Sequence, residues 1–212
     1  MMKSFFRAAA LVAVVAVAIL PFLSHAKTTM TTAGYQPPVS GADLAKYCSH
    51  PHRHLIMVTK QGTIKIQLFD KLAPHHVAQI SQLAKDHFYD GTTFHRVIPG
   101  FMIQGGDPNS RDNDLNNDGM GGYGKTLNAE FSAVHHDRGI CSMARTADPN
   151  SASSQFFIMH NRYPSLDNQY TVWGQVVEGI EVVDKIVNLK KVQGDNPGKA
   201  AEITKCYIEE GK

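Results

Sequence analysis

Apolar and polar residues alternate in short runs along most of the chain, and these runs predict many short strands. The first run, 55–59, is followed by a Gln-Gly pair and by 63–68, where apolar and polar residues alternate with a period of two. This alternation is typical of a strand with one buried face, and the glycine between the runs predicts a hairpin. Further strands are predicted at 93–98, 101–104, 140–143, 155–159, 170–177 and 202–208.

Two stretches have helical spacing of apolar residues instead. Pro74 begins a run that ends near Gly91, and a second run covers 180–189. Proline fits a first helical turn because the donor that it lacks would be unpaired there. Many short strands with glycine-rich turns and two helices predict a mainly β fold, closed or sandwiched, with helices covering its ends. His75 and His76, in the first helical turn, are expected to face solvent.

The N-terminus has the pattern of a secretory signal peptide. Lys3 and Arg7 precede an apolar run at 8–23, and Ser24, His25 and the small residue Ala26 follow. The alternative is an uncleaved membrane anchor, but the run is shorter than the roughly 20 residues that span a bilayer. We therefore expect cleavage after Ala26.

Three segments follow from these patterns. Residues 1–26 are the signal peptide, 27–54 are a polar and irregular N-terminal extension, and 55–212 form one domain. The whole chain has 21 Lys and Arg residues and 19 Asp and Glu residues, and the signal peptide contains two of the basic ones. The mature chain is then neutral, so its net charge gives no reason to expect nucleic acid or an anionic membrane surface as a partner.

The chain contains three cysteines, Cys48, Cys141 and Cys206. Cys141 lies in an apolar run and is interpreted as a small hydrophobic residue. Cys48 precedes the first predicted strand and Cys206 lies in the last. The sequence leaves two alternatives open, a disulfide between Cys48 and Cys206 or free thiols throughout.

The segment 112–119 has the acidic and amide residues that begin an EF-hand calcium loop. Its twelfth position would be Lys125, where calcium needs a bidentate glutamate, so a solvated turn is favoured.

His50, His52 and His54 alternate along the chain, but nothing supplies a complete ligand set. No metal or nucleotide cofactor is expected, and no Ser-His-Asp set is evident in the sequence.

The densest group of informative residues is the segment FHRVIPGFMIQGGD, at 94–107. It predicts two strands around a Pro-Gly turn, with Arg96 as a single cation among aromatic and apolar residues. On these residues alone, Arg96 is either a surface arginine whose stem packs on the sheet or a cation that needs a partner or a ligand.

This segment closely resembles the signature of the cyclophilins, and a second block, at 143–145 and 154–158, resembles their other hallmark. The resemblance extends from about Leu55 to Ile208 in the family's order and spacing. It implies an eight-stranded closed antiparallel β-barrel capped by two α-helices. It also implies a peptidyl-prolyl cis-trans isomerase that acts on proline-containing polypeptides.

The resemblance also assigns roles to residues. Arg96 matches the catalytic arginine, and Gln104 matches the glutamine that orients it. Eight further residues match substrate-groove positions: Phe101, Met102, Ala144, Arg145 (through its backbone), Gln155, Phe157, Leu166 and Tyr170.

Two positions depart from the cyclosporin-sensitive members of the family. Ser165 stands in place of a tryptophan and Tyr170 in place of a histidine. Loss of the indole removes contact area and a hydrogen-bond donor, so weak cyclosporin binding is expected. Similar departures mark bacterial exported cyclophilins, which favours the periplasm over secretion, with no membrane attachment after cleavage.

The alternative function is a non-catalytic module that binds proline-containing peptides as a chaperone. The presence of both Arg96 and Gln104 favours catalysis, since a pure binder needs no donor aimed at a twisted bond.

Overall fold

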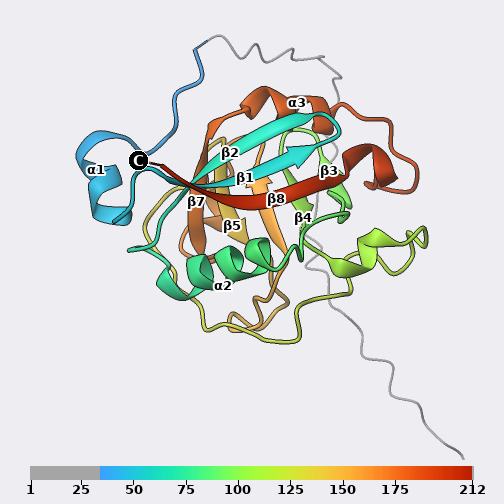
Figure 1. Ribbon diagram of the computed structural model, residues 1–212, viewed down its shortest axis with the longest axis horizontal. Coiled ribbons are helices and arrows are strands. Elements are labelled where there is room, and N and C mark those ends of the chain that lie inside the picture. The colour runs from blue at the N-terminus through green and yellow to red at the C-terminus, as the bar shows by residue number, and fades with distance from the viewer. Residues whose placement is uncertain (1–33, 212) are drawn as a thin grey trace, which may run out of the picture.

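Eight antiparallel strands form one curled sheet in the computed structural model, which describes residues 34–211 (Figure 1). The strands run in the order β3-β4-β6-β5-β7-β2-β1-β8. Their bounds are β1 Arg53–Thr59, β2 Gly62–Leu68, β3 Arg96–Ile98, β4 Met102–Gly105, β5 Ile140–Met143, β6 Phe156–Met159, β7 Val172–Glu178 and β8 Ile203–Glu210. Each strand overlaps a run where the sequence pattern predicts one, although β1 begins two residues earlier and β8 ends two residues later than predicted. The predicted signal peptide lies outside the described residues.

The sheet is not a continuously closed barrel. Of the predicted closed barrel with two helices, the number of strands and their antiparallel direction are confirmed, whereas closure is not and a third helix is present. The edge strands β3 and β8 do not pair with each other. A short bridge joins Thr93 to Glu202, just before each of these two strands. Beyond the bridge, the N–H of Val97 donates to the carbonyl of Asp195 (3.0 Å), so a loop occupies the place where β8 would pair with β3.

Three α-helices pack around the sheet: α1 (Gly41–Tyr47), α2 (Pro74–Lys85) and α3 (Ile180–Val187). In Figure 1, α2 and α3 lie at opposite ends of the curled sheet, and both bury apolar side chains in the core inside it. The sequence pattern predicts both, and α2 begins with proline at its first turn as expected. Among the described residues, no helix is long and apolar enough to cross a bilayer.

The expectation that His76 faces solvent is wrong. Its side chain is fully buried, and Nδ1 lies 2.5 Å from the Glu130 carboxylate. Residues three and four apart share one face of a helix, which places His76 on the same face as the buried Ile80 and Leu83. The carboxylate of Glu130 also accepts the N–H groups of His75 and His76, and so satisfies free donors at the start of α2.

Part of the N-terminal extension is ordered and packs on the sheet, which the prediction of an irregular segment did not anticipate. The backbone of Val39 exchanges two hydrogen bonds with the side-chain amide of Gln175 on β7. From α1, Tyr47 packs on Phe69, with ring centroids 5.8 Å apart. Burial of a few apolar side chains therefore anchors the extension although most of its residues are polar.

The sheet divides the apolar side chains into two clusters. The inner cluster lies inside the curl and includes Val97, Ile103 and Phe156. The outer cluster lies on the opposite face and includes Met102 and Phe157. Alternation along each strand produces this division, because successive side chains point to opposite faces.

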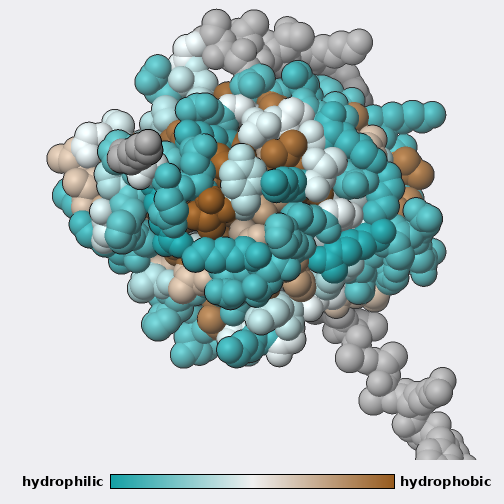
Figure 2. Space-filling model, in the orientation of Figure 1, coloured by the Kyte–Doolittle hydropathy of each residue, from teal (hydrophilic) through white to brown (hydrophobic). Residues whose placement is uncertain are grey.

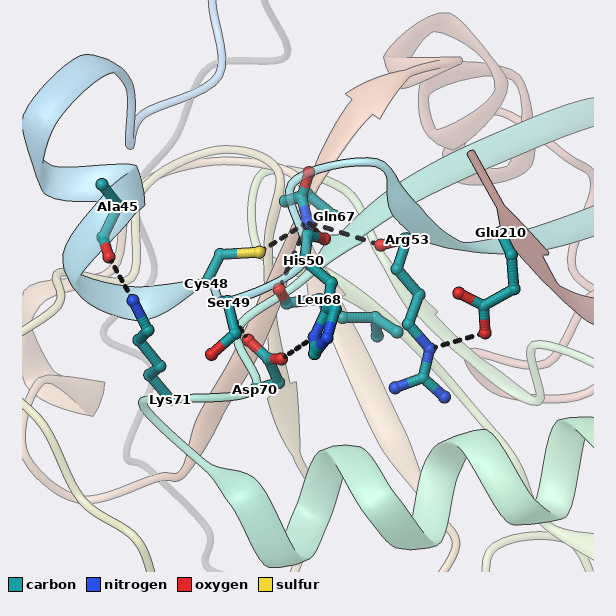
Figure 3. Close-up of polar contacts among 10 residues, drawn as sticks. All are labelled: Ala45, Cys48, Ser49, His50, Arg53, Gln67, Leu68, Asp70, Lys71 and Glu210. Atoms are coloured by element: carbon teal, nitrogen blue, oxygen red, sulfur yellow. Dashed lines mark hydrogen bonds and ion pairs between the residues drawn. The ribbon is translucent and has the colours of Figure 1, made fainter. Parts of the chain in front are cut away.

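All three cysteines are free and buried, so the possible disulfide between Cys48 and Cys206 is excluded. Cys206 belongs to the inner cluster. Cys48 caps α1, and its Sγ accepts a hydrogen bond from Nε2 of Gln67 at 3.1 Å (Figure 3). Gln67 stands between the inner-facing residues Ile66 and Leu68 of β2, so Cys48 lies against the opposite face of the sheet from Cys206.

We therefore expect three titratable thiols per chain when the mature protein is unfolded without reductant and alkylated. Burial raises the pKa of the Cys206 thiol far above its ordinary value and also raises that of Cys48, so both are slow to react in the folded state. Mass spectrometry counts the alkylated sites. A single modified thiol would contradict this arrangement.

Two suspected metal sites take ordinary structural roles. Nδ1 of His50 pairs with the Asp70 carboxylate at 2.7 Å (Figure 3). In the calcium-like segment, Asp112 and Asp114 accept N–H groups two residues further on, as in Asx turns. Residues 34–211 contain no group of three or more His, Cys, Asp or Glu side chains arranged to hold a metal ion.

Candidate active site

The register of three strands places Arg96, Gln104 and Phe157 in one row. Arg96 on β3 pairs with Gln104 on β4, and Gln104 pairs with Phe157 on β6. The sequence neighbours of Arg96 and Gln104, Val97 and Ile103, point into the inner cluster. Arg96, Gln104 and Phe157 therefore project together from the outer face of the sheet.

A directed chain of hydrogen bonds links the arginine to two glutamines. Nη1 of Arg96 donates to Oε1 of Gln104 at 3.5 Å, the long limit of a hydrogen bond. Nε2 of Gln104 donates to Oε1 of Gln155 at 2.9 Å. Each amide therefore uses its oxygen toward one neighbour and its nitrogen toward the next, which orients both side chains.

A loop fixes Gln155, the last residue in this series of hydrogen bonds. Nε2 of Gln155 donates to the carbonyls of Gly119 (3.0 Å) and Gly121 (2.8 Å). The buried carboxylate of Asp107 in turn accepts the N–H groups of Gly119 and Gly121. The glycine-rich loop thus sets the position of Gln155, and through it that of Gln104.

A group of apolar side chains adjoins the row, at the place where the resemblance implies the proline pocket. Met102 and Phe157 form its buried floor, with 2% and 5% of their surfaces exposed. Its half-buried walls belong to the same outer cluster and come from Phe101, Ala144, Leu166 and Tyr170. The flat rings and short aliphatic groups suit a small apolar ring such as that of proline.

Two contacts orient the walls. The Phe101 ring packs against Tyr163, with centroids 4.5 Å apart. The guanidinium of Arg145 lies 4.6 Å from the centroid of the Tyr170 ring and donates twice to the carbonyl of Gln169. The side chain of Arg145 thereby holds the segment that carries Tyr170.

Arg96 makes no ion pair with any residue in the part of the chain that the structure describes, and its side chain is only partly buried. Its one side-chain hydrogen bond among these residues goes to the neutral amide of Gln104. Most of its five donors thus remain available at the edge of the apolar pocket. This arrangement suits a ligand that is apolar on one side and accepts hydrogen bonds on the other.

All ten residues that the sequence assigns to the site meet on this face. The sequence did not reveal Tyr163, the carbonyls of Gly119 and Gly121, or a hydrogen-bonded group next to Phe157 made of Ser142, His136 and Asp167. The three side chains are linked by hydrogen bonds, but Ser142 is fully buried and cannot meet a substrate as a nucleophile. No local signal in the sequence marks this group, because its members come from three separate segments.

Comparison with known proteins decides the family. Residues 54–208 match the family model described as cyclophilin type peptidyl-prolyl cis-trans isomerase/CLD. The chain belongs to the cyclophilin family. A probable peptidyl-prolyl cis-trans isomerase of Brucella suis biovar 1 is 39% identical over 192 residues, which cover 88% of this cyclophilin and 98% of that protein.

Other relatives support membership of the same family. A peptidyl-prolyl cis-trans isomerase of Synechococcus elongatus is 43% identical over 145 residues, covering 65% of this chain and 94% of its own. A Cryptosporidium parvum cyclophilin type isomerase, crystallised in the presence of the dipeptide Ala-Pro, matches with a TM-score of 0.67 and 30% identity. That match covers 74% of this chain and 99% of the other. The predicted family and the predicted class of enzyme are confirmed.

The face formed by β2, β1 and β8 is different in character. Figure 2 shows it as mostly hydrophilic, with small hydrophobic patches between the polar side chains. A hollow of about 340 Å³ on this side is lined by Lys65, Glu178, Glu181 and Glu209 among others. Its charged walls do not suit a proline ring, so the outer face of β3, β4 and β6 remains the candidate active site of this cyclophilin.

Proposed function

We propose that this cyclophilin catalyses rotation about X-Pro peptide bonds in exported proteins and thereby assists their folding, with Arg96 as the hydrogen-bond donor. The observation that carries the proposal is the placement of Arg96. Its guanidinium has no carboxylate partner among the described residues, is oriented by Gln104, and lies beside an apolar pocket.

The chemistry of the X-Pro bond explains why such a donor accelerates rotation. Amide resonance creates a barrier of about 18 to 20 kcal/mol, and both isomers of an X-Pro bond are populated. As the bond twists, the prolyl nitrogen loses conjugation and becomes a better acceptor. A donor aimed at that nitrogen binds the twisted state more tightly than either planar state, which lowers the barrier. No proton is transferred, because the guanidinium stays charged.

The size of this contribution is limited. A hydrogen bond from a charged donor contributes roughly 1.5 to 3 kcal/mol, and each 1.36 kcal/mol changes a rate about tenfold. Arg96 therefore accelerates the rotation by about 10- to 100-fold. The remaining rate acceleration comes from the apolar pocket, which holds the proline ring while the preceding carbonyl rotates. The pocket residues are Phe101, Met102, Phe157 and Leu166.

The location of the substrate proteins follows from the predicted signal peptide. A chain that is cleaved after Ala26 and released into the periplasm meets newly exported polypeptides. The test is to express the full chain in a bacterium with two membranes and to sequence the N-terminus of the periplasmic protein. We expect the sequence to begin at Lys27, and we expect Ala26→Gln to block cleavage because the site needs a small residue. Uncleaved protein in the membrane or the cytoplasm would contradict export.

Weak inhibition by cyclosporin is a further expectation. Ser165 is exposed beside the pocket wall at Leu166 and offers neither the area nor the donor of an indole. We expect Ser165→Trp to tighten cyclosporin binding by about tenfold or more, which corresponds to roughly 1.4 kcal/mol. Isothermal titration of both proteins measures the difference. Nanomolar binding by the unaltered chain would contradict the expectation.

A non-catalytic binding module is the second candidate. The same apolar pocket suits it, because holding a proline ring requires no catalysis. The two functions separate in one assay, since a binder leaves the exchange rate between cis and trans peptide unchanged, whereas an isomerase raises it.

A further inference from the structure

Three polar side chains meet next to Phe157, in the floor of the proposed proline pocket. Nε2 of His136 lies 2.9 Å from Oγ of Ser142, and Nδ1 lies 3.1 Å from Oδ1 of Asp167. Both Ser142 and His136 are fully buried. The N–H of His136 also donates to Oδ1 of Asp167, at 2.7 Å, so the carboxylate holds both the ring and the backbone of this histidine.

These contacts have the connectivity of a hydrolase triad, but they do not form one. A nucleophilic serine must reach a substrate carbonyl, and Ser142 has no exposed surface. The ring of Phe157 stacks on His136, with centroids 6.1 Å apart and planes inclined by 22°. The group therefore lies against Phe157 in the floor of the pocket, where it supports other side chains.

The supported side chains are those of the pocket. His136 stacks on Phe157 and meets the edge of Tyr170, with centroids 6.3 Å apart. Ser142 pairs with Phe157 across β5 and β6. Asp167 directly follows the short helix η2 (Pro164–Leu166), whose last residue forms a wall. One imidazole thus connects the floor of the pocket to both the Leu166 wall and the Tyr170 wall.

We propose that His136 is a positioning residue for proline binding. In this arrangement Nδ1–H donates a hydrogen bond to Asp167, which leaves Nε2 to accept a hydrogen bond from the hydroxyl of Ser142. With both nitrogens bonded, the ring cannot turn, and it holds Phe157 and the η2 segment at a fixed separation. The inference rests on the proposed use of this pocket for proline.

The kinetic consequence is specific. Phe157 and Leu166 contact the proline ring in the planar and in the twisted states alike. Loosening them weakens binding of both states equally, which raises KM and leaves kcat nearly unchanged. Removal of Arg96, in contrast, acts on the twisted state and lowers kcat.

The test compares two variants with a matched control. His136→Phe keeps a ring against Phe157 but loses both hydrogen bonds, and Asp167→Asn keeps the shape but removes the charge. We expect KM for an Ala-Pro peptide to rise about three- to tenfold in each, with kcat within about twofold of the unaltered protein. His76→Phe alters another buried histidine paired with a carboxylate, and it should leave KM unchanged. A KM within about twofold of the unaltered protein in folded His136→Phe and Asp167→Asn would overturn the proposal.

A measurement on the unaltered protein covers the case in which a variant does not fold. Nitrogen-15 NMR of the histidine rings reports which nitrogen carries the proton. We expect His136 as a single tautomer with the proton on Nδ1, and a proton on Nε2 would overturn the proposal. Failure of the proposed function is distinguishable, since the unaltered protein would then show no catalysed isomerisation at all.

Discussion

Arg96→Ala is expected to lower kcat/KM for an X-Pro peptide by about 10- to 100-fold, because one hydrogen bond from a charged donor to the twisted nitrogen is lost. The fold should remain intact. Arg96 is partly exposed, and its hydrogen bond to Gln104 is long, at 3.5 Å. We expect the free energy of unfolding to change by less than about 1 kcal/mol, as is usual for exposed positions. A protease-coupled assay and urea unfolding provide the two measurements.

Arg53→Ala is the matched control. Arg53 is also a strand arginine, but it lies on β1 and pairs with Glu210 at 3.0 Å. An exposed ion pair contributes about 1 kcal/mol or less, so this variant should fold and retain kcat/KM within about twofold. A folded Arg96→Ala protein with the rate of the Arg53→Ala protein would exclude the proposed role of Arg96.

Gly106→Ala is expected to lower the free energy of unfolding by about 2 to 5 kcal/mol, the sum of left-handed backbone strain and overpacking. Gly106 has φ of 85°, which a side chain disfavours. A Cβ there would lie 2.5 Å from the backbone oxygen of Ser154 and 2.9 Å from the ring of Phe156. The close approach brings the Gln155 segment against β4, so activity should fall as well. Urea unfolding measures the stability change.

Gly124→Ala is the control that separates backbone strain from overpacking. Its φ of 84° is nearly the same as that of Gly106, but a Cβ at Gly124 meets nothing within 4 Å. Only backbone strain applies, and we expect a loss of about 1 to 2 kcal/mol. Equal losses in the two variants would show that the contact with Ser154 is not tight.

The sequence predicted the strands and two helices because each is encoded locally. Alternation in 63–68 and the proline at the start of α2 are visible without tertiary contacts. Closure of the sheet and burial of His76 depend on partners distant in sequence. The 192–201 loop takes the place of β8 beside β3, and Glu130 pairs with a histidine in α2. Neither partner is marked by a local pattern.

In the candidate site, too, some residues could be identified from the sequence and others only from the structure. Arg96, Gln104 and the pocket residues were identified through a family resemblance carried by two long motifs, and the register of β3, β4 and β6 brings them together. His136 and Asp167 lie in less distinctive segments and meet only in three dimensions. Their contribution to the pocket required the structure.

Exchange NMR on an Ala-Pro peptide with catalytic amounts of mature protein tests the central claim most directly. The account predicts exchange cross-peaks between the cis and trans proline resonances, which weaken strongly when Arg96→Ala replaces the unaltered protein at equal concentration. Peptide-induced shifts at Phe101 and Phe157 without exchange between the isomers would contradict catalysis and leave only a proline-binding module.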